Sequence, residues 1–131
     1  MDAERDCKLA ARIEMVMEIM CRKEQIEDLK EFRRLSRVLE NVLHLCGTKV
    51  NGKHLGLHKA LDMAEFEGPY WDRVFEKLRP HLPIEIARDC SRIRSLPPVQ
   101  KARETESCMN LLRRFLAGPL MKQIVKPEAR S

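Results

Sequence analysis

Histidines and cysteines are the residues whose spacing comes closest to a metal site. His54 and His58 are four residues apart, which suits one face of a helix, and Cys46 lies eight residues before His54. Imidazole and thiolate groups bind zinc when three or four converge. His54, however, falls in a glycine-rich loop, and a further ligand would have to come from His81 or Cys90 at no characteristic spacing. We therefore predict no metal here, with surface or capping roles for the histidines.

Catalytic signatures are missing from the sequence. It contains no Gly-x-Ser-x-Gly, no glycine-rich phosphate loop and no His-Glu-x-x-His. These motifs respectively present a nucleophilic serine, bind phosphate groups and bind a catalytic zinc ion. Its carboxylates sit among Lys and Arg at helical spacing, which is typical of solvated helix faces. The prediction is a protein without enzymatic activity and without a cofactor.

Five cysteines are scattered through the chain, at Cys7, Cys21, Cys46, Cys90 and Cys108. Their odd number and the lack of a Cys-x-x-Cys pair predict reduced thiols that pack as small apolar side chains. The charged N-terminus does not resemble a secretory signal, and no apolar run approaches the roughly 20 residues that span a bilayer. These features predict a cytoplasmic protein without a transmembrane segment, and a nuclear location is also compatible with them.

Basic charge is concentrated in the last third of the chain. Residues 88–131 hold ten Lys/Arg and four Asp/Glu, whereas residues 1–87 hold fifteen and sixteen. Such an excess attracts acidic protein surfaces, anionic lipid or nucleic acid. Tyrosine is enriched at protein interfaces, so we include the single tyrosine, Tyr70, among the predicted partner-binding residues. The predicted partner-binding residues are Tyr70, Arg88, Arg92, Lys101, Arg103, Arg113 and Arg114.

Helical periodicity dominates the first half of the chain. Residues 2–22 place Leu9, Ile13 and Val16 on one face, together with Met17 and Met20, while Met15 falls off it. Residues 26–46 keep apolar side chains three or four apart, with a wider stripe that predicts a more buried helix. Gly47 stands where a C′ glycine would end that helix.

Glycines and prolines divide the second half. Residues 47–56 hold three glycines and an Asn-Gly pair, and we interpret them as a loop rather than a pair of strands. A short helix should follow at 57–66, with Leu57, Leu61 and Ala64 facing inward. Pro69, Pro83 and Pro97-Pro98 precede apolar runs and predict helices at 70–79, 84–94 and 99–116. A final turn is expected at 120–125.

The pattern therefore predicts an all-α protein, a compact bundle of six to seven helices in a single domain. We expect the domain to cover residues 1–126, with a polar tail at 127–131. Trp71 begins an apolar pattern at i, i+3, i+4 and i+7 and should pack in the core, which leaves the neighbouring Tyr70 toward solvent.

Three stretches of the chain resemble the RUN domain family. Leu39-Glu40-Asn41-Val42-Leu43-His44 is similar to the family's Leu-Glu-x-Val-Leu, and Tyr70-Trp71 to its aromatic-Trp pair. Leu112-Arg113-Arg114-Phe115-Leu116, followed by Leu120-Met121 and Ile124, is similar to its Leu-Arg-x-x-Leu region. Order and spacing agree over about residues 35–126. Two departures are that Lys101-Ala102-Arg103-Glu104 lacks the family's following Trp, and that Leu45-Cys46 separate His44 from its glycine.

The resemblance implies an adaptor that binds a small GTPase or a trafficking partner. Arg113 and Arg114 would then meet an acidic partner surface, which favours specificity and rapid association. Two other functions remain open from the residues alone. One is nucleic-acid binding through the basic third, although no aromatics are interleaved for base stacking. The other is self-association through the Met-rich first helix.

Overall fold

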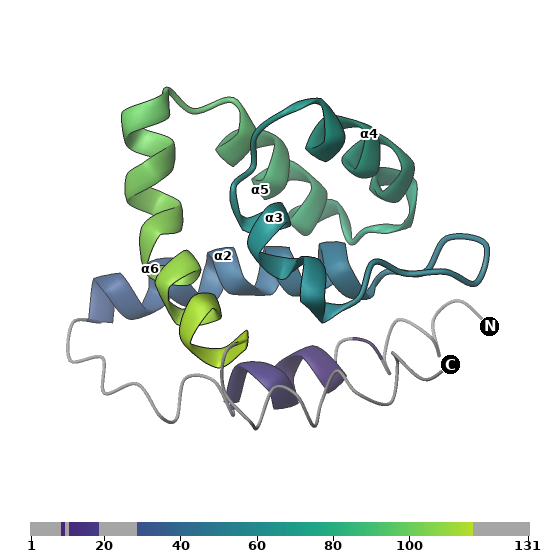
Figure 1. Cartoon of the computed structure of the whole chain (residues 1–131), viewed down its shortest axis with the longest axis horizontal. Coiled ribbons are helices and arrows are strands. Elements are labelled where there is room, and N and C mark those ends of the chain that lie inside the picture. The colour runs from purple at the N-terminus through teal and green to yellow at the C-terminus, as the bar shows by residue number, and fades with distance from the viewer. Residues whose placement is uncertain (1–8, 10, 19–28, 117–131) are drawn as a thin grey trace.

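The computed structural model describes residues 9, 11–18 and 29–116, and this part of the chain is an all-helical bundle (Figure 1). The predicted all-α, single-domain fold is confirmed, with six α-helices in the described residues. The predicted turn at 120–125 and tail at 127–131 lie outside them. In chain order the elements are a helical segment at 11–18, α2 (Leu29–Gly47), the 3-10 turn η1 (Leu57–Lys59), α3 (Ala60–Ala64), α4 (Pro69–Leu78), the 3-10 turn η2 (Arg79–His81), α5 (Ile84–Arg94) and α6 (Pro98–Leu116).

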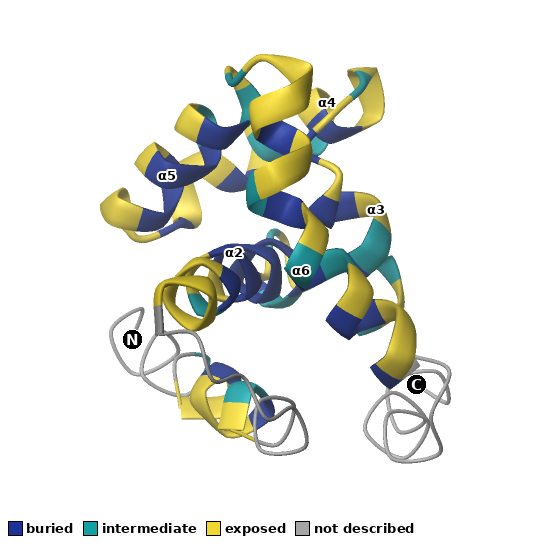
Figure 2. Cartoon of the chain, turned by 90° about the vertical axis from the view of Figure 1, so that its left-hand side faces the viewer, coloured by how far each residue is buried: buried dark blue, intermediate teal, exposed yellow. Residues whose placement is uncertain are grey.

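Helix α2 forms the centre of the bundle and packs against α3, α5 and α6. Its apolar positions recur every three or four residues, so one broad face is buried while its first turns stay exposed (Figure 2). Leu39, Val42 and Leu45 are completely buried. In the described 11–18 segment Ile13 and Val16 are the buried residues, so this part of the first predicted helix is less buried than α2, as predicted.

The three helix starts predicted from the prolines are confirmed to within one residue, and α5 begins at the predicted Ile84. Pro69 and Pro98 are the first residues of α4 and α6, where a missing N–H costs no hydrogen bond. Pro83 instead stands one residue before α5, with the extended ψ of 142° typical of a capping position. Within the described residues, no helix is long and apolar enough to cross a membrane.

Gly47 is needed for a different reason from the one predicted. It is the last residue of α2 and is not among the glycines with positive φ, so it does not act as a left-handed cap. A Cβ atom at this position would lie 2.7 Å from Leu9 Cδ1. The absent side chain therefore lets the first helix approach the end of α2.

Replacing Gly47 with leucine should loosen the first helix from the bundle. The larger side chain would occupy the space of Leu9, and overpacking of this kind costs about 1–2 kcal/mol. Amide hydrogen exchange at residues 11–18 is expected to accelerate, while exchange in α5 stays unchanged. A Leu9→Ala/Gly47→Leu double variant should restore part of the protection. Unchanged exchange at 11–18 in Gly47→Leu would contradict this account.

The loop after α2 ends in a tight two-residue turn. Asn51 and Gly52 both adopt positive φ, 55° and 78°, and Val50 and Lys53 exchange backbone hydrogen bonds of 2.8 and 3.1 Å. This is the geometry of a type I′ hairpin turn, which Asn-Gly favours. The predicted loop is confirmed, and its tip is a hairpin turn with no strand beside it among the described residues.

The segment at 57–66 is less regular than predicted. It divides into η1 and the five-residue α3, and Leu57 and Leu61 are only half-buried. Phe66 leaves the helical path with a φ of 50°, a strained value for an aromatic residue. That conformation is retained because it accompanies a fully buried ring, which packs 5.4 Å from Trp71. The predicted short helix is therefore confirmed as a 3-10 turn that continues into α3, with Ala64 buried, but it ends at Ala64 instead of Phe66. The core role of Trp71 is also confirmed.

Candidate partner-binding surface

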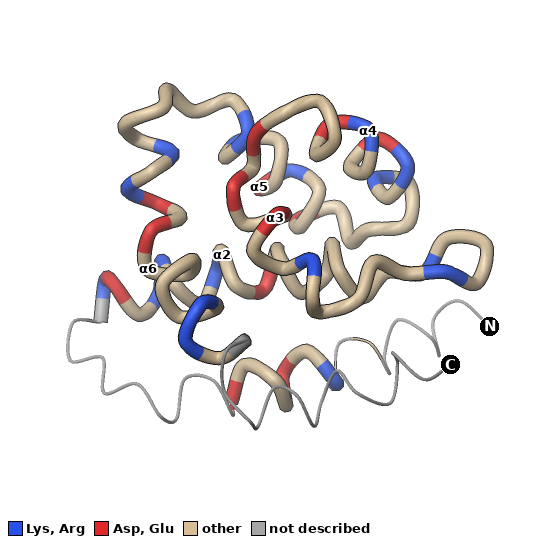
Figure 3. The backbone as a smooth tube through the Cα atoms, viewed as in Figure 1, with Lys and Arg blue, Asp and Glu red and all other residues tan. Residues whose placement is uncertain are grey.

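The seven predicted partner-binding residues lie on three helices, and the structure gives them different roles. Tyr70 is on α4, Arg88 and Arg92 are on α5, and the other four are on α6. Figure 3 shows basic positions followed by acidic positions along the first half of α6, and basic positions again in its last turns. The basic third is therefore not one uniform cationic face.

Lys101 does not lie on an open surface. Only 8% of its side chain is exposed, and its Nζ atom donates a hydrogen bond to Glu67 Oε2, before α4. This bond and the nearby positive charges hold the pKa of Glu67 below its usual value. The expectation that Lys101 contributes to an exposed basic face is wrong, because α6 turns it toward the interior.

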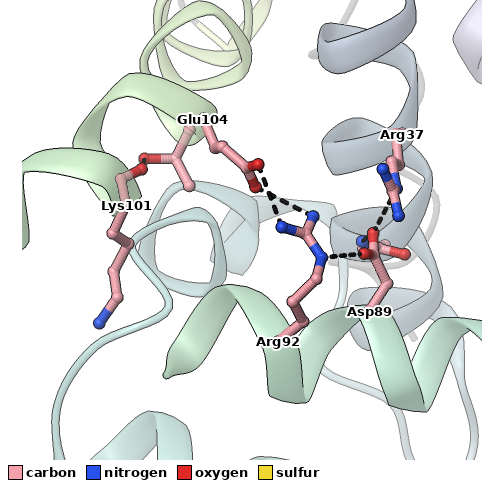
Figure 4. Close-up of polar contacts among 7 residues, drawn as sticks. Arg37, Asp89, Arg92, Lys101 and Glu104 are labelled. Atoms are coloured by element: carbon pink, nitrogen blue, oxygen red, sulfur yellow. Dashed lines mark hydrogen bonds and ion pairs between the residues drawn. The ribbon is translucent and has the colours of Figure 1, made fainter. Parts of the chain in front are cut away.

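Arg92 belongs to an internal ion-pair network centred on Asp89 (Figure 4). Its Nε atom donates to Asp89 Oδ1 at 2.9 Å, and its two Nη atoms donate to the Glu104 carboxylate at 3.0 and 3.1 Å. Asp89 also accepts hydrogen bonds from Arg37 at 3.0 Å and from Asn41 at 2.7 Å. This network joins α5 to α2 and α6. The Arg92 guanidinium uses its Nε and both Nη atoms in hydrogen bonds to carboxylates of the same protein.

A second network ties α5 to α4. Arg94 donates to both carboxylate oxygens of Asp72 at 2.8 and 3.1 Å, and it also reaches Glu67 at 3.3 Å. Bidentate pairing of this type adds geometric specificity. The hydrogen bond from Arg94 holds the pKa of Asp72 below its usual value. A third cation of the basic third is thus used to position helices.

Three of the predicted arginines remain exposed along α6: Arg103, Arg113 and Arg114. We call these residues the α6 basic stripe. Arg103 and Arg114 are eleven residues apart, so they share one side of the helix. Asn110 lies between them and accepts hydrogen bonds from Arg113 at its Oδ1 atom and from Arg114 at its carbonyl. The stripe extends for about 16 Å along the helix axis.

Arg88 and Tyr70 are exposed away from this stripe. Arg88 points outward from α5. Tyr70 is 42% exposed at the start of α4, as predicted. The Lys59 ammonium lies 5.8 Å from the centroid of its ring, within range of a cation–π attraction.

A basic turn of α2 was missed from the sequence. Arg33, Arg34 and Arg37 are all exposed, and Glu31 accepts a 3.0 Å hydrogen bond from Ser107 of α6. Arg34 lies one helical turn from Glu31, and Arg103 lies one turn from Ser107. The close spacing of Arg33, Arg34 and Arg37 could have identified this segment from the sequence. It was missed because residues 1–87 as a whole have almost no net charge.

Cysteine and histidine chemistry is restricted by burial. Cys46, Cys90 and Cys108 are buried thiols that form no disulfide, as predicted, while Cys7 and Cys21 lie outside the described residues. Burial raises the pKa of Cys46 and of Cys90 to about 12, so both stay protonated and weakly nucleophilic. Among the described residues, no three His, Cys, Asp or Glu side chains come together as metal ligands.

Comparisons with known proteins add no relative to this description. No protein-family model matches the chain, and neither a curated protein nor a solved structure matches it. The candidate surface therefore depends on its own geometry, in which α2 and α6 meet at the Glu31–Ser107 hydrogen bond and each helix has exposed arginines.

Proposed function

We propose that this domain is a non-catalytic protein-interaction module that binds an acidic surface of a partner through the α6 basic stripe. The supporting observation is that the basic residues of the last third fall into two groups with different surroundings. Arg92, Arg94 and Lys101 form ion pairs that join one helix or loop to another, whereas Arg103, Arg113 and Arg114 lie exposed along a single helix. Arginine is favoured at interfaces because its planar group binds carboxylates in two-point contacts.

A small GTPase or a trafficking protein is the first partner class to test. The RUN-like motif that includes Leu112-Arg113-Arg114 falls in α6, where both arginines are exposed and Leu112 is buried. The proposal also includes a cytoplasmic location, with which buried reduced thiols are compatible. Nucleic-acid binding and self-association are treated as alternative outcomes of the same experiment.

Charge reversal on α6 should abolish most of the binding. With Arg113→Glu/Arg114→Glu, we expect the partner's Kd to rise at least about tenfold, since each position turns attraction into repulsion; tenfold corresponds to about 1.4 kcal/mol. The matched control is Arg73→Glu/Lys77→Glu on α4, which reverses two exposed positive charges that lie one helical turn apart. The control should change Kd less than about twofold.

The measurement starts with affinity capture from a nuclease-treated lysate and continues with fluorescence titration of the purified partner. Equal weakening by both double variants would indicate general attraction to a basic protein and would remove the α6 surface from the proposal. Capture that disappears on nuclease treatment would replace the proposal with nucleic-acid binding, whose affinity falls steeply with salt. A concentration-dependent mass without any other protein would replace it with self-association.

A further inference from the structure

The hairpin loop at residues 48–56 presents positive charge in a fixed shape. Its base is closed by a 2.9 Å hydrogen bond from the backbone N–H of Gly56 to the carbonyl of Cys46. Its tip is closed by the reciprocal pair between Val50 and Lys53 and by the type I′ turn. Figure 1 shows this loop extending away from the helices beyond the end of α2. A loop held in this way loses little conformational entropy when it binds.

The charge of this region has one sign. From Asn41 to Leu61 the sequence contains three Lys and three His and no Asp or Glu. Lys49 and Lys53 are both exposed, on either side of the turn, and Figure 3 shows the basic positions on the projecting loop. Asp62 is the nearest acidic residue along the chain after this region, and it pairs with Lys59 at 3.9 Å. The tip therefore concentrates positive potential.

An exposed aromatic ring contacts the segment that follows the loop. Lys59 is the last residue of η1, three residues after Gly56, and its ammonium is 5.8 Å from the centroid of the Tyr70 ring. Tyr70 combines an apolar ring with a hydroxyl, which makes it a frequent contact residue in protein interfaces. We give the name hairpin surface to the two exposed lysines of the loop together with the pair that follows it: Lys49, Lys53, Lys59 and Tyr70.

We propose that the hairpin surface is a second docking site, which binds an acidic segment of a partner protein. Carboxylates would meet Lys49 and Lys53, and an apolar side chain of the same segment would pack on Tyr70. The site deepens the proposed function, because it assumes a protein partner. It is nevertheless separate from the α6 basic stripe. The loop follows the C-terminal end of α2, whereas α6 contacts α2 near its N-terminal end, through the Glu31–Ser107 hydrogen bond.

Other anionic partners fit this surface less well. Lipid attraction supplies about 1 kcal/mol per lysine near the membrane, and the Asn51-Gly52 tip offers no apolar side chain to insert. Single-stranded nucleic acid is held by successive aromatic side chains, whereas Tyr70 is the one aromatic residue in the hairpin surface. A carboxylate-rich peptide needs only the two charges and the single ring.

The test is a fluorescence-anisotropy titration of the full chain with a labelled polyglutamate peptide that contains one leucine. Lys49→Glu/Lys53→Glu should raise Kd at least about fivefold, and Tyr70→Ser should raise it about threefold. The matched control, Lys77→Glu/Arg79→Glu, reverses two exposed charges elsewhere and should change Kd less than about twofold. Gly52→Val alters no charge but strains a residue with φ of 78°, so it should also weaken binding.

Four results would overturn the inference. Equal weakening by the hairpin and control variants would show attraction to net charge alone. Loss of binding in Arg113→Glu/Arg114→Glu with full binding in the hairpin variant would place the peptide on α6, which leaves the proposed function intact. Hairpin-dependent binding to phosphatidylserine vesicles or to single-stranded RNA, with none to the peptide, would assign a different partner class. Absence of any peptide binding by the wild-type chain would remove the site.

Discussion

Replacing Trp71 with alanine should lower the free energy of unfolding by about 4 kcal/mol, within the range for large buried aromatic residues. The indole is 2% exposed, its ring stacks on Phe75 at 4.9 Å and it lies 5.4 Å from Phe66. Its Nε1 atom donates a 3.0 Å hydrogen bond to the carbonyl of Met63. The ring thus joins α4 to α3. Its removal leaves a cavity and takes one hydrogen bond from the Met63 carbonyl, which keeps a 3.3 Å bond from the backbone N–H of Phe66. Urea denaturation followed by circular dichroism measures the change.

Trp71→Phe is the matched control for this loss. It keeps most of the ring but removes the hydrogen bond to Met63, so we expect a cost of about 1–2 kcal/mol. A second comparison is Phe75→Ala, which truncates a half-buried ring at the edge of the same cluster and should cost less than Trp71→Ala. If Trp71→Ala cost no more than Phe75→Ala, the indole would not be the centre of the α3–α4 contact.

Replacing Asp89 with alanine is the second change with a large expected effect. Asp89 is nearly buried, and its carboxylate accepts hydrogen bonds from Arg37, Asn41 and Arg92. Removing one partner of a buried ion pair costs 3–5 kcal/mol in general. Arg37 is 62% exposed and can be rehydrated, so we expect about 2–3 kcal/mol here. Thermal and urea denaturation measure the loss.

Acid titration offers a separate check on the Asp89 network. Burial alone would raise the pKa of Asp89, but the hydrogen bonds from Asn41 and Arg92 and the nearby arginine charges hold it below its ordinary value of 3.8. A carboxyl whose pKa is lower in the folded state contributes stability above its unfolded pKa and loses it as pH falls through the folded pKa. Wild-type stability should therefore fall below about pH 4 more steeply than that of Asp89→Asn.

Glu104→Gln provides the control for both measurements. It weakens the outer pair with Arg92 while leaving Asp89 in place, and a pair this exposed is expected to contribute less than about 1 kcal/mol. A cost for Glu104→Gln equal to that of Asp89→Ala would show that Arg92, and not the buried carboxylate, determines the strength of the network. Parallel acid profiles for wild type and Asp89→Asn would contradict the assigned pKa direction.

Much of the fold could be predicted because local signals were strong. The period of the apolar residues identified α2, and Pro69 and Pro98 marked the first residues of α4 and α6. The failures arose where tertiary contacts overrode local preference. Phe66 adopts a left-handed conformation along with a buried ring, and Gly47 is small because Leu9 packs against it. The contacts of Phe66 and Gly47 are made by residues far apart in the sequence or outside a helix, so the spacing of apolar residues does not predict them.

The candidate site was harder to predict because charge in a sequence does not reveal pairing. Arg92 and Arg103 look equivalent along the chain and both are exposed, yet Arg92 pairs with Asp89 of its own helix and with Glu104 of α6. The partners of Lys101 and Arg94 lie more than twenty residues away, at Glu67 and Asp72. Only the three-dimensional arrangement separates cations that position helices from cations available to a partner.

The central place of α2 also has a consequence for synthesis on the ribosome. Residues such as Leu39 and Val42 on α2 emerge long before α6, the helix that packs against α2 and contains Leu112. Until α6 has been made, the apolar face of α2 has only part of its final cover, and exposed apolar surface of this kind invites aggregation or chaperone binding. Truncation before α6 should therefore give an insoluble nascent chain rather than a smaller folded domain.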